Sequence, residues 1–181
     1  ERMVTSDYTE AERTRLGSAL PDFYGGFNNS FTYKNFDLNF YFYFSHGGQI
    51  YNYNYAGSMH DGVNPGDNLS TEALNAWTPN NRFTNVPRYV TNNVDRGNQI
   101  SSRFLEDGTY VRLKNISLGY DLPSTLLQKI KLQRLRAFVS GENLWTLTDF
   151  NGFDPEVSLA GTTSNNIPGV KTITFGLKVD L

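Results

Sequence analysis

The stretch FDLNFYFYFS, residues 36–45, decides the fold, because Phe or Leu occupies every second position along it. A period of two places successive side chains on opposite faces of a β-strand, whereas a helix has a period of 3.6. The segment therefore predicts a strand with one strongly apolar face. On that face lie Phe36, Leu38, Phe40, Phe42 and Phe44, and on the other lie Asp37, Asn39, Tyr41, Tyr43 and Ser45.

Four other segments repeat the alternation, so we expect five strands. Lys34-Asn35 separates the first two, and a link of two residues predicts a tight hairpin. Near Lys114-Asn115 the apolar side chains change from odd to even positions, which indicates either a β-bulge or two short strands with a break. The expected strands cover about residues 23–34, 36–45, 109–122, 134–147 and 171–181.

The connections between these strands are very unequal in length. Those at about 46–108 and 149–169 are rich in Gly, Asn, Asp and Pro, while 123–131 predicts a turn with one helical twist. A connection as long as 46–108 without periodic structure is unusual in a compact soluble domain, but long external loops are normal in transmembrane barrels. The expected strands are also longer than the roughly 5–6 residues of globular proteins and suit a membrane.

The order of the connections favours the same interpretation. If the last strand runs toward the periplasm, the two long connections lie outside the cell and the two short ones lie in the periplasm. Outer-membrane barrels follow this arrangement. Five strands cannot close a barrel, and open edges are not tolerated in hydrocarbon, so the remaining strands must belong to a longer chain. The sequence therefore predicts an all-β fold that is part of a large transmembrane β-barrel.

The composition argues against several other classes of protein. The 181 residues carry a net charge of −2, with no block of Lys or Arg, which argues against nucleic-acid binding. There is no cysteine and no run of 18 apolar residues. The sequence shows no nucleotide-binding or catalytic motif, so we expect no enzyme and no cofactor. The chain starts at Glu1 without a signal-peptide pattern, which suggests a mature product, an engineered piece or a fragment of a longer chain.

Potential metal ligands lie mainly in the long connections. His46 and His60 are too sparse for a metal site, and we expect solvated loop histidines. Asp149, Asp154 and Glu156 carry oxygen ligands of the kind that calcium prefers, but their spacing matches no EF-hand loop. We therefore expect a solvated acidic loop and no metal site.

Four long motifs resemble those of a known family. They are PDFYGGFNNSFTYKNFDLNF (21–40), WTPNNRFTNVPR (77–88), SSRFLEDGTYVRLKNISLGYDLP (101–123) and SGENLWTLTDFNGFDPE (140–156). Together they look like the C-terminal segments of the SusC/RagA-type TonB-linked (TonB-dependent) outer-membrane transporters of Bacteroidota. The resemblance covers nearly the whole chain, in the right order.

The resemblance implies a 22-stranded barrel around an N-terminal plug, with the plug domain absent from this chain. It implies an integral protein of the bacterial outer membrane, in contact with membrane lipid, with a periplasmic C-terminus. A SusD-like surface lipoprotein would close over the barrel as a lid, and TonB would supply energy through the missing N-terminal region. The cargo would be an oligosaccharide or, in some members, a peptide. The barrel assembly machinery would insert the protein.

Four groups of candidate site residues follow from this interpretation. The lipid-facing residues would be Phe36, Leu38, Phe40, Phe42, Phe44, Ile173, Phe175, Leu177 and Val179, and the lumen-facing ones Asp37, Asn39, Tyr41 and Tyr43. Tyr51, Tyr53, Tyr55 and Trp77 could contact cargo or lid, with local loop packing as the plainer alternative. The terminal assembly signal would comprise Phe175, Gly176, Leu177, Val179 and Leu181, although the family usually ends on an aromatic residue.

Two other functions stay open at this point. A soluble β-sandwich could bind carbohydrate through exposed aromatic residues, and it would remain soluble without detergent. A passive barrel porin would share the strands but would have no plug upstream. The leading hypothesis is active import of nutrient oligosaccharides or peptides.

Overall fold

The computed structural model describes residues 8–94, 96–130, 132–163 and 167–180. The chain forms two compact units. The sheet unit contains residues 21–48, 108–155 and 167–181, and the loop unit contains residues 1–20, 49–107 and 156–166.

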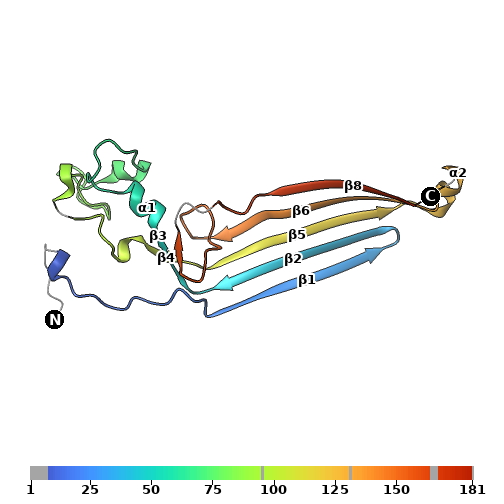
Figure 1. The fold of residues 1–181 in the computed structure, drawn as a ribbon, viewed down its shortest axis with the longest axis horizontal. Coiled ribbons are helices and arrows are strands. Elements are labelled where there is room, and N and C mark those ends of the chain that lie inside the picture. Colours follow the sequence, from blue (N-terminus) through green and yellow to red (C-terminus); the bar gives the residue numbers. More distant parts are fainter. Residues whose placement is uncertain (1–7, 95, 131, 164–166, 181) are drawn as a thin grey trace. The chain divides into compact units, whose positions relative to one another are not determined.

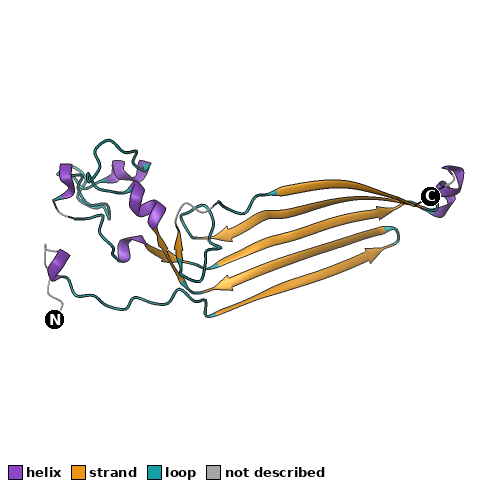
Figure 2. Cartoon of the chain, viewed as in Figure 1, coloured by secondary structure: helices purple, strands orange, loops and turns teal. Residues whose placement is uncertain are grey.

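The sheet unit is a single antiparallel sheet of five long strands (Figures 1 and 2). Its order is β1-β2-β5-β6-β8, so each strand pairs with its neighbour along the chain within this unit. The predicted set of five antiparallel strands is confirmed, and the observed ends lie within one residue of the expected ranges. The strands are β1 (Phe23–Tyr33), β2 (Phe36–His46), β5 (Tyr110–Asp121), β6 (Arg134–Thr148) and β8 (Thr172–Asp180).

A bulge in β5 brings the apolar side chains of its two halves to one face. Tyr41 pairs with Asn115 and Phe42 pairs with Leu113, so the register passes over Lys114. The register of β5 with β6 shifts at the same place, and Asn143 of β6 has a positive φ of 52°. One extra residue moves every later side chain of the strand to the opposite face. The bulge interpretation is therefore correct, and the alternative of two short strands is not.

The two short connections leave the same end of the sheet, because the strands are antiparallel. One is the two-residue turn Lys34-Asn35, in which Lys34 has a φ of 54°. The other contains α2 (Ser124–Ile130), the expected helical twist, and its Leu127 is buried. Both long connections leave the opposite end of the sheet. The fold thus has the alternation of short and long connections that the sequence suggested.

The loop unit is folded, although the sequence shows no regular pattern there. It contains a three-stranded sheet in the order β4 (Leu105–Asp107), β3 (Gln49–Asn52) and β7 (Thr162–Thr163). The helices are α1 (Tyr53–Ser58) and the short 3-10 turns η1 (Tyr8–Glu10), η2 (Thr71–Asn75), η3 (Thr91–Asn93) and η4 (Ser102–Phe104). These elements are too short for periodicity to reveal. No helix among the described residues has the length and apolarity needed to span a membrane.

Asn52 joins the small elements of the loop unit. Its side chain is 1% exposed and donates to Glu106 of β4 at 2.9 Å. Its carbonyl oxygen accepts the backbone N–H of Tyr55 at 3.0 Å and the hydroxyl of Thr163 in β7 at 3.1 Å. Met59 and Phe104 are fully buried in the same unit. One satisfied amide thus links the start of α1 to two strands.

Candidate functional site

One face of the five-stranded sheet is apolar over several neighbouring strands. The register aligns Phe42 of β2 with Leu113 of β5, and Leu113 with Trp145 of β6. On β8, Phe175 is 80% exposed and Ile173 is 61% exposed. A continuous exposed apolar surface marks a contact with lipid or with another protein. All residues expected to face lipid lie on this face: Phe36, Leu38, Phe40, Phe42, Phe44, Ile173, Phe175, Leu177 and Val179.

The other face of the sheet is mostly polar and carries the four residues expected to face the lumen. Asp37, Asn39, Tyr41 and Tyr43 pair with Gly119, Ser117, Asn115 and Arg112, which lie on the same face. Tyr41 lies against the backbone of β1, because a Cβ at Gly26 would be 2.5 Å from the Tyr41 ring. The ring of this tyrosine thus covers the sheet and does not stand away from it.

A network of ion pairs crosses this polar face near the short connections. Arg136 of β6 donates to Asp37 of β2 at 2.7 Å and to Asp121 of β5 at 3.0 Å. Arg134 donates to both carboxylate oxygens of Asp121, at 2.8 and 3.2 Å. A Cβ at Gly119 would meet Asp37 at 2.5 Å, so glycine leaves room for the network. The pairs connect three strands across the face.

A second charged group lies at the other end of the polar face. Arg112 of β5 is 4% exposed; it donates to Asp154 at 2.5 Å and to the hydroxyl of Thr146 at 3.0 Å. Asp154 also accepts the backbone N–H of Gly169 at 2.9 Å. The expectation of a solvated acidic loop was therefore wrong for Asp154, because the connection after β6 folds back onto the sheet.

A cavity of about 270 Å³ lies beside this ion pair, within the sheet unit. It is bounded by the ends of β5 and β6 and by the connection that leads to β8. Sequence reasoning missed this site, although an arginine in an alternating strand was a signal that a partner was required. Its lining includes Arg112, Asn143, Thr146, Thr148, Phe153, Asp154 and Lys171.

The tyrosines of the loop unit differ in exposure. Tyr51 and Tyr55 pack edge-on against the buried ring of Phe104, with ring centroids 6.2 and 5.8 Å away. Tyr53 packs on Tyr51 and is 46% exposed. The Tyr55 hydroxyl donates to Glu72 at 2.5 Å. Burial, followed by this hydrogen bond, raises the pKa of Tyr55 to about 12. Tyr51 and Tyr55 therefore help to build the unit, and Tyr53 remains accessible.

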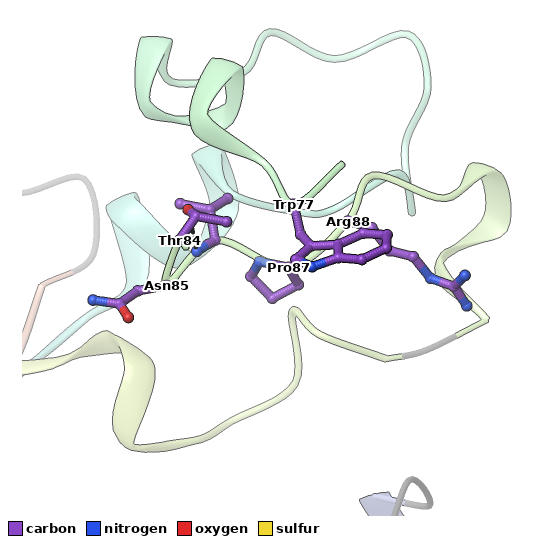
Figure 3. A pocket seen from close by; sticks show the side chains of 6 residues that line it. Trp77, Thr84, Asn85, Pro87 and Arg88 are labelled. Atoms are coloured by element: carbon purple, nitrogen blue, oxygen red, sulfur yellow. Dashed lines mark hydrogen bonds between the residues drawn. The ribbon is translucent and has the colours of Figure 1, made fainter. Parts of the chain in front are cut away.

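Trp77 lines a separate cavity of about 480 Å³ within the loop unit (Figure 3). Its backbone N–H donates to the carbonyl of Val86 at 2.9 Å, and its side chain is 41% exposed. Pro87 and Arg88 flank the indole ring (Figure 3). An accessible indole beside a proline and a cation offers a surface suited to stacking.

The two histidines have different environments. His46 is exposed and packs 4.8 Å from Phe23, between ring centroids. His60 is 3% exposed, and its Nδ1 accepts backbone N–H groups of Gly62 and Asn64 at 3.3 and 3.4 Å. The expectation of a solvated loop histidine was therefore wrong for His60. Among the described residues, no cluster of three or more potential metal ligands occurs.

The terminal assembly motif has a structural counterpart in β8. Phe175, Leu177 and Val179 are exposed on the apolar face. On the polar face, a Cβ added at Gly176 would overlap the ring of Phe138 in β6. The glycine therefore provides the space in which that ring lies. Leu181, the last residue of the expected motif, lies outside the described residues.

No protein-family model matches the chain. TonB-dependent receptor P3 of Formosa agariphila is 40% identical over 184 residues, which cover 96% of this chain and 18% of that protein. TonB-dependent receptor SusC of Bacteroides thetaiotaomicron is 28% identical over 157 residues, covering 85% of this chain and 14% of that protein.

Solved structures of the RagAB peptide importer share the fold. The closed-closed state gives a TM-score of 0.82 at 30% identity, covering 97% of this chain and 19% of the matched chain. The open-open state gives 0.81 at 29% identity, covering 98% and 19%. The chain spans less than a fifth of the length of these relatives. The resemblance predicted from the motifs, to the SusC/RagA-type TonB-linked transporters, is confirmed.

Proposed function

We propose that this chain, which is similar to SusC/RagA-type TonB-dependent receptors over nearly its whole length, is a wall segment of an outer-membrane nutrient importer. The importer would take up oligosaccharides or peptides. The RagAB relative is a peptide importer, which supports peptide cargo, and the similarity to SusC supports the wider class.

The observation that carries the proposal is the two-faced sheet. Its apolar face is exposed on β8, where Phe175 and Leu177 are 80% and 73% exposed, and its other face bears the ion pairs of Arg136 and Arg112. In a transmembrane barrel, outward side chains contact hydrocarbon and inward ones line a polar lumen. The apolar face would contact lipid, and Asp37, Asn39, Tyr41 and Tyr43 would form part of the lumen wall.

Two partners complete the proposed importer. Similarity to SusC and to RagAB supports a surface lipoprotein of the SusD type, which would cover the barrel. Similarity to TonB-dependent receptors supports energy from TonB, received through a part of the protein outside this chain. The short connections would lie in the periplasm, together with the end of β8, as in other outer-membrane barrels.

The loop unit would lie outside the cell and would supply contacts to cargo or lid. Tyr53 and Trp77 are accessible, at 46% and 41% exposure, and are the better candidates. Tyr51 and Tyr55 would act indirectly, by holding the unit together through Phe104. This divides the four aromatic candidates into two that could touch a ligand and two that position the loop.

Site-directed labelling of the full-length transporter tests the placement of the sheet. The present sequence contains no cysteine, so Phe175→Cys and Thr174→Cys can be compared in a full-length background without other reactive cysteines. A spin label at 175 should be accessible to oxygen dissolved in lipid, and one at 174 to a water-soluble reagent. Equal access of the water-soluble reagent to both positions would contradict the membrane placement.

Cargo uptake tests the transport mechanism separately. Uptake that stops when TonB is deleted supports active import. Uptake that continues at the same rate without TonB would contradict the proposal and favour the passive porin. A protein that leaves the membrane without detergent would favour the soluble sandwich.

A further inference from the structure

Two groups that line the cavity beside Arg112 have no partner among the described residues: the Lys171 ammonium and the Asn143 Oδ1 atom. We propose that the cavity binds a carboxylate-bearing unit of the cargo, with Lys171 as the cation that holds the carboxylate. This inference rests on the proposed import function, because it assumes that the polar face of the sheet meets cargo. It goes further by assigning a ligand chemistry to one site.

The charged side chains that line the cavity are Arg112, Asp154 and Lys171. Arg112 and Asp154 neutralise each other, and the second oxygen of Asp154 accepts the N–H of Gly169. Lys171 also lines the cavity and is exposed. It makes no ion pair or hydrogen bond with any of the residues described in the structure. The lining side chains thus include two cations and one carboxylate, a balance that favours an anionic ligand group.

Asn143, another residue of the lining, has an unsatisfied acceptor. The Asn143 side chain donates to the carbonyl of Val170 at 3.3 Å. Its Oδ1 atom is buried and has no hydrogen-bond partner among the described residues. Buried polar atoms normally have a partner, so a donor from a bound group or an ordered water is required. A ligand that carries both a carboxylate and a hydroxyl or N–H group would satisfy Lys171 and Asn143 together.

Gly169 lines the cavity among three of its polar side chains. A Cβ built there would lie 3.5 Å from the Asp154 carboxylate and 3.6 Å from both Arg112 Nη1 and Asn143 Nδ2. Three polar side chains thus converge on a position that has no side chain of its own. The hydrogen bonds of Arg112 to Thr146 and of the Gly169 N–H to Asp154 fix the ion pair, so this part of the polar lining is organised before a ligand arrives.

The size of the cavity suits a single unit of a longer cargo. Its volume of about 270 Å³ is slightly below the range of roughly 300–1,000 Å³ for sites that enclose drug-sized ligands. Phe153, which is 81% exposed, lies at its edge. An exposed aromatic ring provides an apolar surface for a sugar ring or an amino-acid side chain. The rest of the cargo would extend into the lumen.

The carboxylate of Glu142 opposes this selectivity. Glu142 pairs in register with Thr172, the residue next to Lys171, and lies exposed on the polar face. It forms no ion pair with Lys171 in the part of the chain that the structure describes. Because like charges repel, Glu142 should weaken binding of an anionic unit, and its neutralisation should strengthen it. Neutralising Glu142 and removing Lys171 should therefore change the affinity for an anionic unit in opposite directions.

Titration calorimetry on the full-length transporter with its lipoprotein partner tests the proposal. One pair of probes is trigalacturonate and its methyl ester, and the other is Gly-Glu-Gly and Gly-Gln-Gly. In at least one pair the acid should bind about tenfold more tightly than its neutral counterpart, the difference expected for one charge contact of about 1.4 kcal/mol. Preference in the first pair assigns a uronate, and preference in the second assigns an acidic peptide.

The variants locate the contact. Lys171→Met should remove most of the preference for the acid, and Glu142→Gln should increase it. Lys178→Met is the matched control, since Lys178 lies on β8, the strand that begins directly after Lys171, and pairs with Arg136, away from the cavity. Equal binding of acid and neutral probes by the wild type, or an unchanged preference in Lys171→Met, would overturn the inference. If uptake still depends on TonB, such a result overturns only the carboxylate site and leaves the proposed import function intact. Uptake that does not depend on TonB contradicts the import function itself.

Discussion

Arg112 and Asp154 are 42 positions apart in the sequence, yet the arginine Nη2 lies 2.5 Å from the aspartate Oδ1. The pair ties the connection after β6 to the polar face of β5. Their side chains are only 5% and 16% exposed, so both charges are largely removed from water. The loop segment around Asp154 is therefore a fixed part of the sheet's polar face.

Breaking this pair should release the segment around residue 154. Asp154→Asn would remove the carboxylate charge that Arg112 contacts, and loss of one partner from a buried pair costs about 3–5 kcal/mol. We expect faster proteolytic cleavage between residues 149 and 170 in the folded protein. Asp149→Asn serves as the control because Asp149 is exposed. Cleavage at the wild-type rate in Asp154→Asn would show that the pair does not hold the segment.

Tyr55 should make the loop unit sensitive to alkali. Burial and the hydrogen bond to Glu72 raise its pKa to about 12, above the ordinary 10.0. Below pH 10 its phenol is protonated in both folded and unfolded states, and its full stabilisation is present. Between pH 10 and about 12 only the unfolded state loses the proton readily, so stability falls.

Ultraviolet titration of wild type against Tyr55→Phe measures this ionisation. The difference between the two proteins should show one tyrosine that titrates near pH 12. Glu72→Gln should lower that pKa without restoring the ordinary value, because burial is the larger cause. A difference spectrum that titrates near pH 10 would disprove the assignment.

Gly176 should be needed for close packing of the last strand. A Cβ there would overlap the ring of Phe138, and overpacking of this kind costs about 1–3 kcal/mol. Gly176→Val should lower the fraction of protein that reaches the heat-modifiable folded form on gels. Phe138→Ala combined with Gly176→Val should recover part of it. If the second substitution brings no recovery, the ring contact is not the reason for the glycine.

A charge should destabilise the protein much more at position 175 of β8 than at the adjacent position 174. Phe175→Arg would place a charge on the proposed lipid-facing side, at a cost of up to about 2–4 kcal/mol near the middle of the bilayer. Thr174→Arg would place it on the polar face, where the cost should be small. Urea unfolding of the full-length protein in lipid vesicles measures both. Equal destabilisation by the two substitutions would argue against a membrane-facing side.

Structural features that are set by neighbouring residues could be predicted from the sequence, and features that depend on distant residues could not. The bulge at Lys114 was predictable because the phase of a strand is visible in neighbouring residues. The hairpin at Lys34-Asn35 was predictable because a two-residue link leaves few other conformations. The elements of the loop unit were not, because β7 spans two residues and β4 spans three. The contacts of Asn52 with Glu106 and Thr163 have no periodic signal.

The sequence by itself determined which side chains share a face of the sheet, because alternation along a strand is a local property of the backbone. It also determined the number of long strands and the unequal connections between them. Only the tertiary structure decided that Asp154 pairs with Arg112, that His60 is buried, and that Lys171 lines a cavity with Asn143. These facts depend on where distant segments meet. Strand register and the paths of the long connections decide that, and no short stretch of the sequence shows either one.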